Sequence, residues 1–159
     1  MNRKGFTLIE LITTIALLAI IALIAFVTIT KVIEKSKVSN CNSLVSNINK
    51  AASEYVSDHR YDSSFVRNVK EQPNGEYTGT ITANTLISGK YLQAPIVNPF
   101  TNEKITDGTN GTPNEQEAIQ IYLTLNSDFT LSSSNIGIDD TNVPSVDYER
   151  LKFLTTCEK

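Results

Sequence analysis

The chain is poor in the residues from which catalytic and metal sites are usually built. Its 159 residues include one histidine, two cysteines and no tryptophan. It has no cysteine and histidine spacing typical of zinc sites, no glycine-rich phosphate loop and no Gly-x-Ser-x-Gly sequence. His59 lies between Asp58 and Asp62, but no nucleophile motif accompanies it. The sequence therefore gives no support for an enzyme, and we expect no catalytic residue, cofactor or metal site.

Two loops carry the oxygen ligands that calcium prefers, at residues 107–111 and 139–142. Neither loop has the full spacing of a calcium-binding loop. We therefore expect ordinary turns at both.

Proline is absent from Phe6 through Val56, and charge is absent from Leu11 through Thr30. An apolar helix of about 20 residues can cross a bilayer core of roughly 30 Å. Glu10 stands at the start of this run, where a carboxylate costs a few kcal/mol or more in a membrane. Such a charge indicates a function.

A helical pattern continues beyond the apolar run. Apolar residues recur at spacings of three and four, with polar residues between them, as in a helix with one packed face. This pattern predicts one helix of about 50 residues, about 75 Å long, whose second half is amphipathic. Its apolar positions are Val38, Cys41, Leu44, Val45, Ile48, Ala51, Ala52, Tyr55 and Val56.

The Gly-Phe-Thr-Leu-Ile-Glu sequence of residues 5–10 resembles the processing and assembly motif of type IV pilins and of pseudopilins from type II secretion and DNA-uptake machines. The resemblance implies that a prepilin peptidase cleaves between Gly5 and Phe6, and that the new amine of Phe6 is methylated. It also implies that Glu10 recruits the subunit to a filament by pairing with the N-terminal amine of a neighbour.

Elementary electrostatics supports this role for Glu10. Cleavage would place the Phe6 amine and the Glu10 carboxylate about one helical turn apart in a low-dielectric layer, where opposite charges attract strongly. Removing one of the two charges would leave the other uncompensated.

Two other interpretations of the N-terminus remain. A secretory signal peptide fits poorly, because its apolar stretch is shorter and ends in a small-x-small site. An uncleaved anchor helix would place Arg3 and Lys4 in the cytoplasm, but it explains neither Glu10 nor Gly5. The chain also departs from many type IV pilins, because residues 25–28 lack their helix-breaking proline.

The part from Lys31 to Lys159 has 12 Lys and Arg residues and 16 Asp and Glu residues, a net charge of −4. Its bulk charge does not favour binding of nucleic acid, and its length suits one compact domain.

Turn and strand signals divide this domain. Residues 58–64 are expected to end the long helix and to connect it onward, and residues 72–75 and 98–100 to form turns. Residues 77–82 are expected to form a short strand and residues 83–92 a short helix that ends near Gly89. Residues 118–125 and 128–132 predict a hairpin with Asn126 and Ser127 as its turn. Residues 148–154 fit either a strand or a short helix.

Cys41 and Cys157 lie at opposite ends of this part. In an oxidising compartment a disulfide could join them. Cys41 fits equally well as a free thiol in a buried apolar stripe, so both alternatives stay open.

We therefore expect an α+β fold in which a long helical spine packs on a small antiparallel sheet. The expected parts are a leader (1–5), a transmembrane and filament-core half of the helix (6–30), an amphipathic half (31–57) and a head (58–159). The expected function is a structural pilin or pseudopilin that spans the cytoplasmic membrane once, with its head outside, and then joins a cell-surface filament. Its expected partners are membrane lipid, the prepilin peptidase, the membrane assembly machinery and other pilins. A minor pilin with a binding or adhesion role is the main alternative, and a membrane-anchored enzyme or sensor domain is a remote one.

Overall fold

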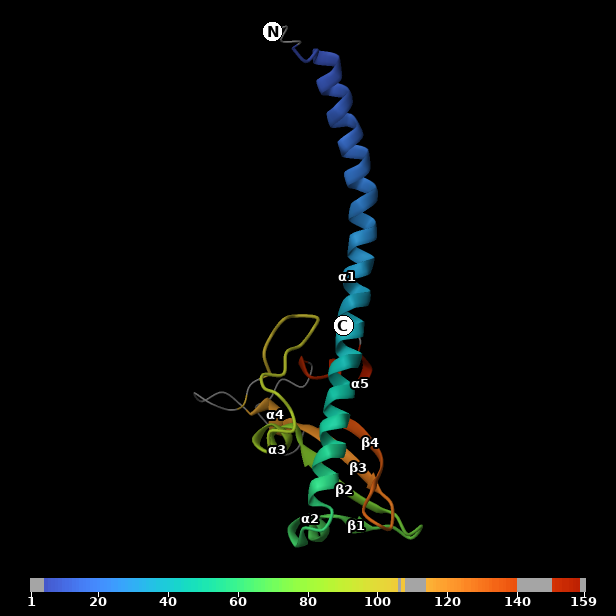
Figure 1. Cartoon of the computed structure of the whole chain (residues 1–159), viewed down its shortest axis with the longest axis vertical. Helices are drawn as coiled ribbons and strands as arrows, with labels where there is room; N and C mark the ends of the chain where they lie inside the picture. The colour runs from blue at the N-terminus through green and yellow to red at the C-terminus, as the bar shows by residue number, and fades with distance from the viewer. Residues whose placement is uncertain (1–4, 106, 108–113, 140–149, 158–159) are drawn as a thin grey trace. The chain divides into compact units, whose positions relative to one another are not determined.

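A computed structural model describes residues 5–105, 107, 114–139 and 150–157 (Figure 1). The chain divides into two compact units, Met1–Lys37 and Val38–Lys159. Its helices are α1 (Leu8–His59), α2 (Ser63–Asn68), α3 (Ala83–Ser88), α4 (Glu115–Ala118) and α5 (Phe153–Thr156), and its strands are β1 (Lys70–Glu71), β2 (Tyr77–Thr82), β3 (Ile119–Leu125) and β4 (Leu131–Ile138). These elements confirm the predicted α+β class.

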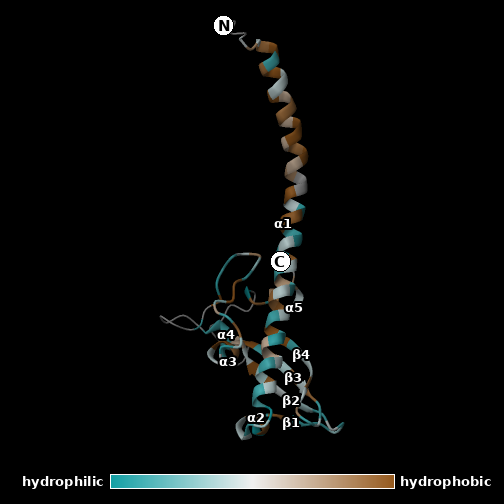
Figure 2. Ribbon diagram, in the orientation of Figure 1, coloured by the Kyte–Doolittle hydropathy of each residue, from teal (hydrophilic) through white to brown (hydrophobic). Residues whose placement is uncertain are grey.

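In the first unit, the described chain is the start of helix α1 and the three residues before it. Large apolar side chains are exposed on all sides of this part of the helix, including Leu11, Ile15, Leu18 and Ile24. In Figure 2 the ribbon of this part is mostly in the brown of hydrophobic residues. Among the described residues, α1 is the one helix long and apolar enough to cross a membrane.

The second unit is built on an antiparallel sheet with strand order β1-β2-β3-β4. Ile81 of β2 faces Ile121 of β3, which in turn faces Ile136 of β4. Buried side chains alternate along β3 with more exposed ones, as expected for a strand with one packed face. The predicted strand at residues 77–82 and the first strand of the hairpin are therefore confirmed.

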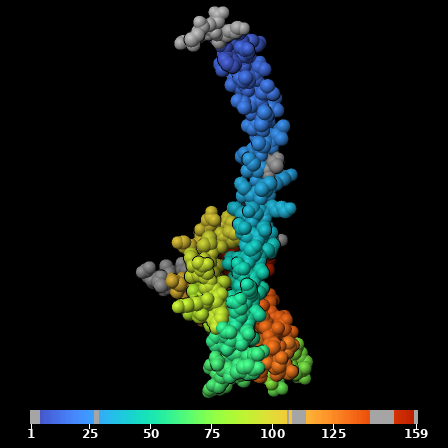
Figure 3. Space-filling view, viewed as in Figure 1, coloured from blue at the N-terminus to red at the C-terminus, as the bar shows by residue number. Residues whose placement is uncertain are grey.

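The part of α1 within the second unit supplies the other side of the core. Its predicted apolar positions are largely buried, although Val38 is exposed. Ser134 of β4 donates a hydrogen bond to Oδ1 of Asn49 at 3.0 Å, which links the sheet to the helix directly. Figure 3 shows β4 along one side of this helical segment and the chain around α3 along the other. Members of the shared core include Cys41, Ile48, Ala52, Val56, Ile81, Ile119, Ile121, Leu123, Leu125 and Ile136.

The predicted two-residue hairpin turn is wrong. The loop runs from Asn126 through Thr130, and β4 begins at Leu131 and extends to Ile138. Asp128 Oδ1 accepts hydrogen bonds from Thr130 N and Thr130 Oγ1, at 3.1 and 2.6 Å. Phe129 takes a positive φ of 60°. These local bonds stabilise a longer loop than a pattern of alternating residues reveals.

Shorter elements also differ from the expectation. Helix α1 ends at His59, but α2 already begins at Ser63, inside the segment predicted to be a connection. No pattern in the sequence predicts strand β1. The predicted short helix and the turns at 72–75 and 98–100 are confirmed, with Gly89 as the C-cap of α3. At the C-terminus α5 overlaps the predicted segment 148–154 only at residues 153 and 154, where the helical alternative is confirmed, and residues 148 and 149 lie outside the described residues.

Candidate functional site

The predicted cleavage site lies just outside the first turn of α1. Residues 5–7 are not helical, and the helix begins at Leu8. The side chain of Phe6 is exposed, and a Cβ atom placed on Gly5 would meet no other atom within 4 Å. The bond between Gly5 and Phe6 is therefore exposed in a segment outside the helix.

Glu10 closes the N-terminal end of α1 through a reciprocal contact with Thr7. Oε2 of Glu10 accepts hydrogen bonds from Thr7 N at 2.9 Å and from Thr7 Oγ1 at 2.8 Å. In return, Thr7 Oγ1 accepts a hydrogen bond from Glu10 N at 3.4 Å. This is a capping box, which pairs backbone N–H groups that the first helical turn leaves without partners.

The hydroxyl groups nearby are satisfied within the helix. Thr13 Oγ1 donates to the carbonyl of Ile9 at 2.7 Å, and Thr14 Oγ1 donates to the carbonyl of Leu11 at 2.8 Å. A hydroxyl group bonded in this way can enter an apolar environment at little cost. Glu10 is the one charged side chain among the described residues from Gly5 to Thr30.

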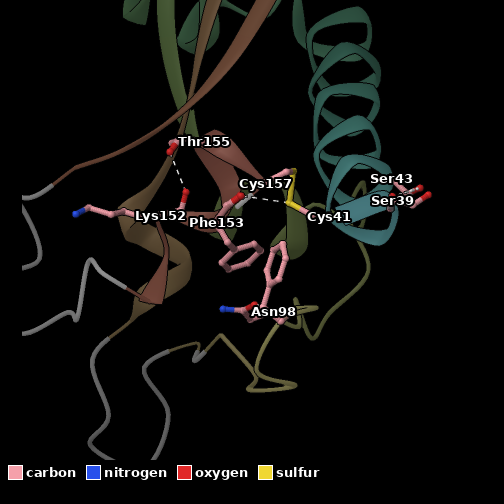
Figure 4. Close-up of a disulfide and its surroundings, with 9 residues drawn as sticks. Ser39, Cys41, Ser43, Asn98, Lys152, Phe153, Thr155 and Cys157 are labelled. Atoms are coloured by element: carbon pink, nitrogen blue, oxygen red, sulfur yellow. Dashed lines mark hydrogen bonds between the residues drawn. A yellow bond between two sulfur atoms is a disulfide. The ribbon is translucent and has the colours of Figure 1, made fainter. Parts of the chain in front are cut away.

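In the second unit, a disulfide joins Cys41 to Cys157 (Figure 4). Their Cα atoms lie 5.5 Å apart, within the ordinary range for a disulfide. Cys41 is fully buried on α1, and Cys157 follows α5 at 8% exposure. Sγ of Cys41 also lies 3.2 Å from the carbonyl oxygen of Phe153. The bond fixes the C-terminal helix against α1 within this unit.

An ion pair holds the segment before α5 in place. Nη1 of Arg150 lies 2.8 Å from Oε1 of Glu115, whose side chain is only 4% exposed. Nε of the same arginine lies 3.3 Å from Oε2 of Glu103, which is half exposed. Asn98, also buried, donates to the carbonyl of Arg150 at 3.4 Å. These contacts join three segments that are far apart in the sequence.

His59 belongs to an aromatic cluster at the end of α1. Its ring stacks on Tyr55 at 4.2 Å between centroids, and its Nδ1 lies 2.9 Å from the carbonyl oxygen of Tyr55. Tyr91 packs edge-on against both rings and donates a hydrogen bond to Asp58 at 2.9 Å. This hydrogen bond raises the pKa of Tyr91, and desolvation by burial raises the pKa of Tyr55. The contacts of His59 are those of a packed residue at a helix end.

Of the two acidic loops, the structure describes Asp107 and Asp139 but not residues 108–111 or 140–142. Gln120 donates a hydrogen bond to Oδ2 of Asp139 at 2.6 Å. Within the described part of the chain, no group of three or more His, Cys, Asp or Glu side chains is arranged to hold a metal ion.

Sequence reasoning missed the role of Thr7. The signal was present, because Thr7-Leu8-Ile9-Glu10 has the Ser/Thr-x-x-Glu spacing of a capping box directly before an apolar run. It also missed Arg150 and Glu115, since no local spacing connects residues 35 positions apart.

Residues 1–26 match the model named prokaryotic N-terminal methylation motif, the class III signal peptide of type IV pilins. This confirms the resemblance predicted from residues 5–10, and the matched segment contains Gly5, Phe6, Thr7 and Glu10. No curated protein and no solved structure matches the chain.

Proposed function

We propose that the chain is the precursor of a structural subunit of a type IV pilus-like filament. The observation that carries the proposal is the coincidence, within the matched residues 1–26, of an accessible Gly5–Phe6 bond with a single carboxylate at the start of an exposed apolar helix. Cleavage at this bond removes residues 1–5, and methylation follows at the amine of Phe6.

The apolar part of α1 first holds the subunit in the membrane. The uncharged run from Leu11 to Thr30 has 20 residues, which as a helix matches a bilayer core of about 30 Å. Its exposed Leu, Ile and Phe side chains can exchange lipid contacts for contacts with the same helix of other subunits. The head remains outside the membrane, where an oxidising environment favours the Cys41–Cys157 bond.

Glu10 then directs polymerisation. Its carboxylate pairs with the Phe6 amine of a neighbouring subunit, in a layer where opposite charges attract far more strongly than in water. The contact joins different surfaces on the two partners, so it does not close and produces a helical filament.

Mass analysis of the N-terminus tests the processing step. The protein is isolated from cells with and without a prepilin peptidase. We expect a mature chain that starts at methylated Phe6 only when the peptidase is present. A chain that keeps residues 1–5 in cells with an active peptidase would overturn the proposal.

Recovery of sheared filaments tests assembly. We expect the wild-type chain in the sheared fraction and the Glu10→Ala variant almost entirely in the membrane fraction. Equal recovery of both would remove Glu10 from the mechanism. The abundance of the chain in this fraction also separates a major subunit from a minor one with a binding role.

A further inference from the structure

We infer that Thr7 is a positioning residue for the assembly contact, because it binds one oxygen of the Glu10 carboxylate and leaves the other for the amine of a neighbouring subunit. This inference rests on the proposed function and adds to it a residue that acts through Glu10.

The two oxygens of Glu10 differ in their surroundings. Oε2 accepts two hydrogen bonds, from the backbone N and the Oγ1 of Thr7. Among the described residues, Oε1 has no hydrogen-bond partner. The capping box therefore fixes the carboxylate while one acceptor oxygen stays available.

A fixed carboxylate favours the contact with a neighbour. A glutamate side chain has several rotatable bonds, and restricting them at the moment of binding opposes association. The capping box has already restricted them in the single subunit. A neighbouring amine therefore meets an anion with a defined direction.

Processing leaves this arrangement intact. Both donors to Oε2 belong to Thr7, which follows the cleaved bond by one residue. The nitrogen of Thr7 remains a peptide N–H after cleavage, because its bond to Phe6 is not cut. The precursor and the mature subunit can therefore both form the capping box.

Four substitutions separate the capping box from the charge. Thr7→Val keeps the branched shape of the side chain and removes its hydroxyl, whereas Thr7→Ser keeps the hydroxyl. Glu10→Gln keeps an acceptor oxygen that suits the third position of a capping box, but it removes the negative charge. Thr7→Ala also lacks the hydroxyl, and it shows whether the branched side chain of valine has an effect of its own.

The experiment uses the full-length chain in cells that carry the peptidase and the assembly machinery. For each variant, sheared filament subunits are measured relative to cleaved subunits in the membrane. We expect incorporation to fall roughly threefold to tenfold for Thr7→Val and Thr7→Ala, as for loss of one hydrogen bond of typical net strength, because the bond from the Thr7 backbone N–H remains. We expect Thr7→Ser to restore it to near the wild-type level.

The double variant Thr7→Val with Glu10→Gln distinguishes positioning of the carboxylate from stabilisation of the helix end. If Thr7 acts by placing the charged oxygen, Thr7→Val should cause no further loss in a Glu10→Gln chain. If Thr7 only stabilises the end of the helix, the two losses should multiply. Multiplied losses, wild-type incorporation of Thr7→Val, or failure of Thr7→Ser to restore assembly would each overturn the inference.

Failure of the proposed function would look different. In that case the wild-type chain would be absent from filaments, or Glu10→Gln would enter them as well as the wild type does. The inference about Thr7 fails alone when Glu10→Gln is defective and Thr7→Val is not.

Discussion

Cys41 on α1 is bonded to Cys157, which lies 116 residues later in the chain and directly follows α5. The bond joins the beginning and the end of the unit Val38–Lys159. It therefore closes almost this whole unit into one covalent loop, and α5 keeps its place beside α1 even when other contacts open.

Loss of this bond should strongly destabilise the second unit. For a loop of this length, the chain-entropy model gives a contribution of about 4–5 kcal/mol, within a usual range of about 2–5 kcal/mol for a native disulfide. We expect Cys157→Ser to lower the free energy of unfolding by an amount in that range. Urea unfolding of the full chain in detergent, followed by tyrosine fluorescence, measures it.

The matched control is the double variant Cys41→Ser with Cys157→Ser. Because either substitution removes the same bond, both single variants and the double variant should have nearly equal stability. A single variant as stable as the oxidised wild type would contradict the assigned contribution of the disulfide.

The sequence predicts the regular parts of this unit well. The apolar stripe from Cys41 to Val56 and the alternation along β3 depend on local periodicity, which the sequence displays directly. The loop Asn126–Thr130 and the start of α2 depend instead on individual side-chain bonds and turn geometry. Strand β1 has only two residues and exists because β2 lies beside it, so no local pattern marks it.

Removing the guanidinium of Arg150 should also destabilise the second unit. Arg150→Met would leave the buried carboxylate of Glu115 without this partner. Because the side chain of Arg150 is itself 34% exposed, we expect a loss below the about 3–5 kcal/mol that breaking a fully buried ion pair costs. Glu103→Ala is the control, because Glu103 is exposed and such pairs contribute at most about 1 kcal/mol. Equal effects of the two substitutions in urea unfolding would contradict the buried role of Glu115.

Asp58→Asn should lower the pKa of Tyr91. The hydrogen bond to Asp58 raises this pKa because it favours the neutral phenol in the folded state. The hydrogen bond therefore stabilises the folded state fully below the ordinary tyrosine pKa of about 10. This contribution is lost as the pH rises through the pKa of Tyr91 in the folded state. Alkaline titration followed by ultraviolet absorbance should show a phenol that ionises earlier in Asp58→Asn.

Two tyrosine variants identify that phenol. Tyr91→Phe should remove the shifted phenol from the titration. Tyr61→Phe should leave that phenol in place, because Tyr61 is exposed and takes no part in the hydrogen bond between Tyr91 and Asp58. The assignment is wrong if Asp58→Asn leaves the titration of Tyr91 unchanged.

The site shows a similar division between local and distant information. Gly5, Phe6 and Glu10 are found from a contiguous motif, and the motif is confirmed by the match over residues 1–26. The role of Thr7 depends on a local spacing to Glu10, but the spacing alone does not show that the two side chains bond. The sequence leaves the link between Cys41 and Cys157 open, because sequence separation alone cannot say whether two cysteines meet in a fold.

Gly137→Ala tests the packing of the sheet face that carries Tyr122, opposite the core. A Cβ at Gly137 would lie 2.4 Å from Cε2 of Tyr122, so the ring must move. We expect a loss of roughly 1 kcal/mol, typical of an off-rotamer side chain. In a Tyr122→Ala chain the same substitution should be nearly neutral. An equal loss in both backgrounds, measured by urea unfolding, would indicate a backbone effect instead.

Gly5→Val should block processing without changing the subunit itself. A Cβ at this position meets nothing within 4 Å, so the variant can keep the structure of the wild type. A peptidase that accepts only glycine before the cleaved bond would exclude the larger side chain by steric clash, and we expect at least a roughly hundredfold slower removal of residues 1–5. Mass analysis of the N-terminus measures cleavage, and a non-reducing gel verifies that the Cys41–Cys157 bond still forms. Because the leader then blocks the Phe6 amine, the membrane-bound precursor should also be absent from sheared filaments. Normal filament recovery of uncleaved Gly5→Val would show that assembly does not need the free amine, and the pairing with Glu10 would have to be abandoned.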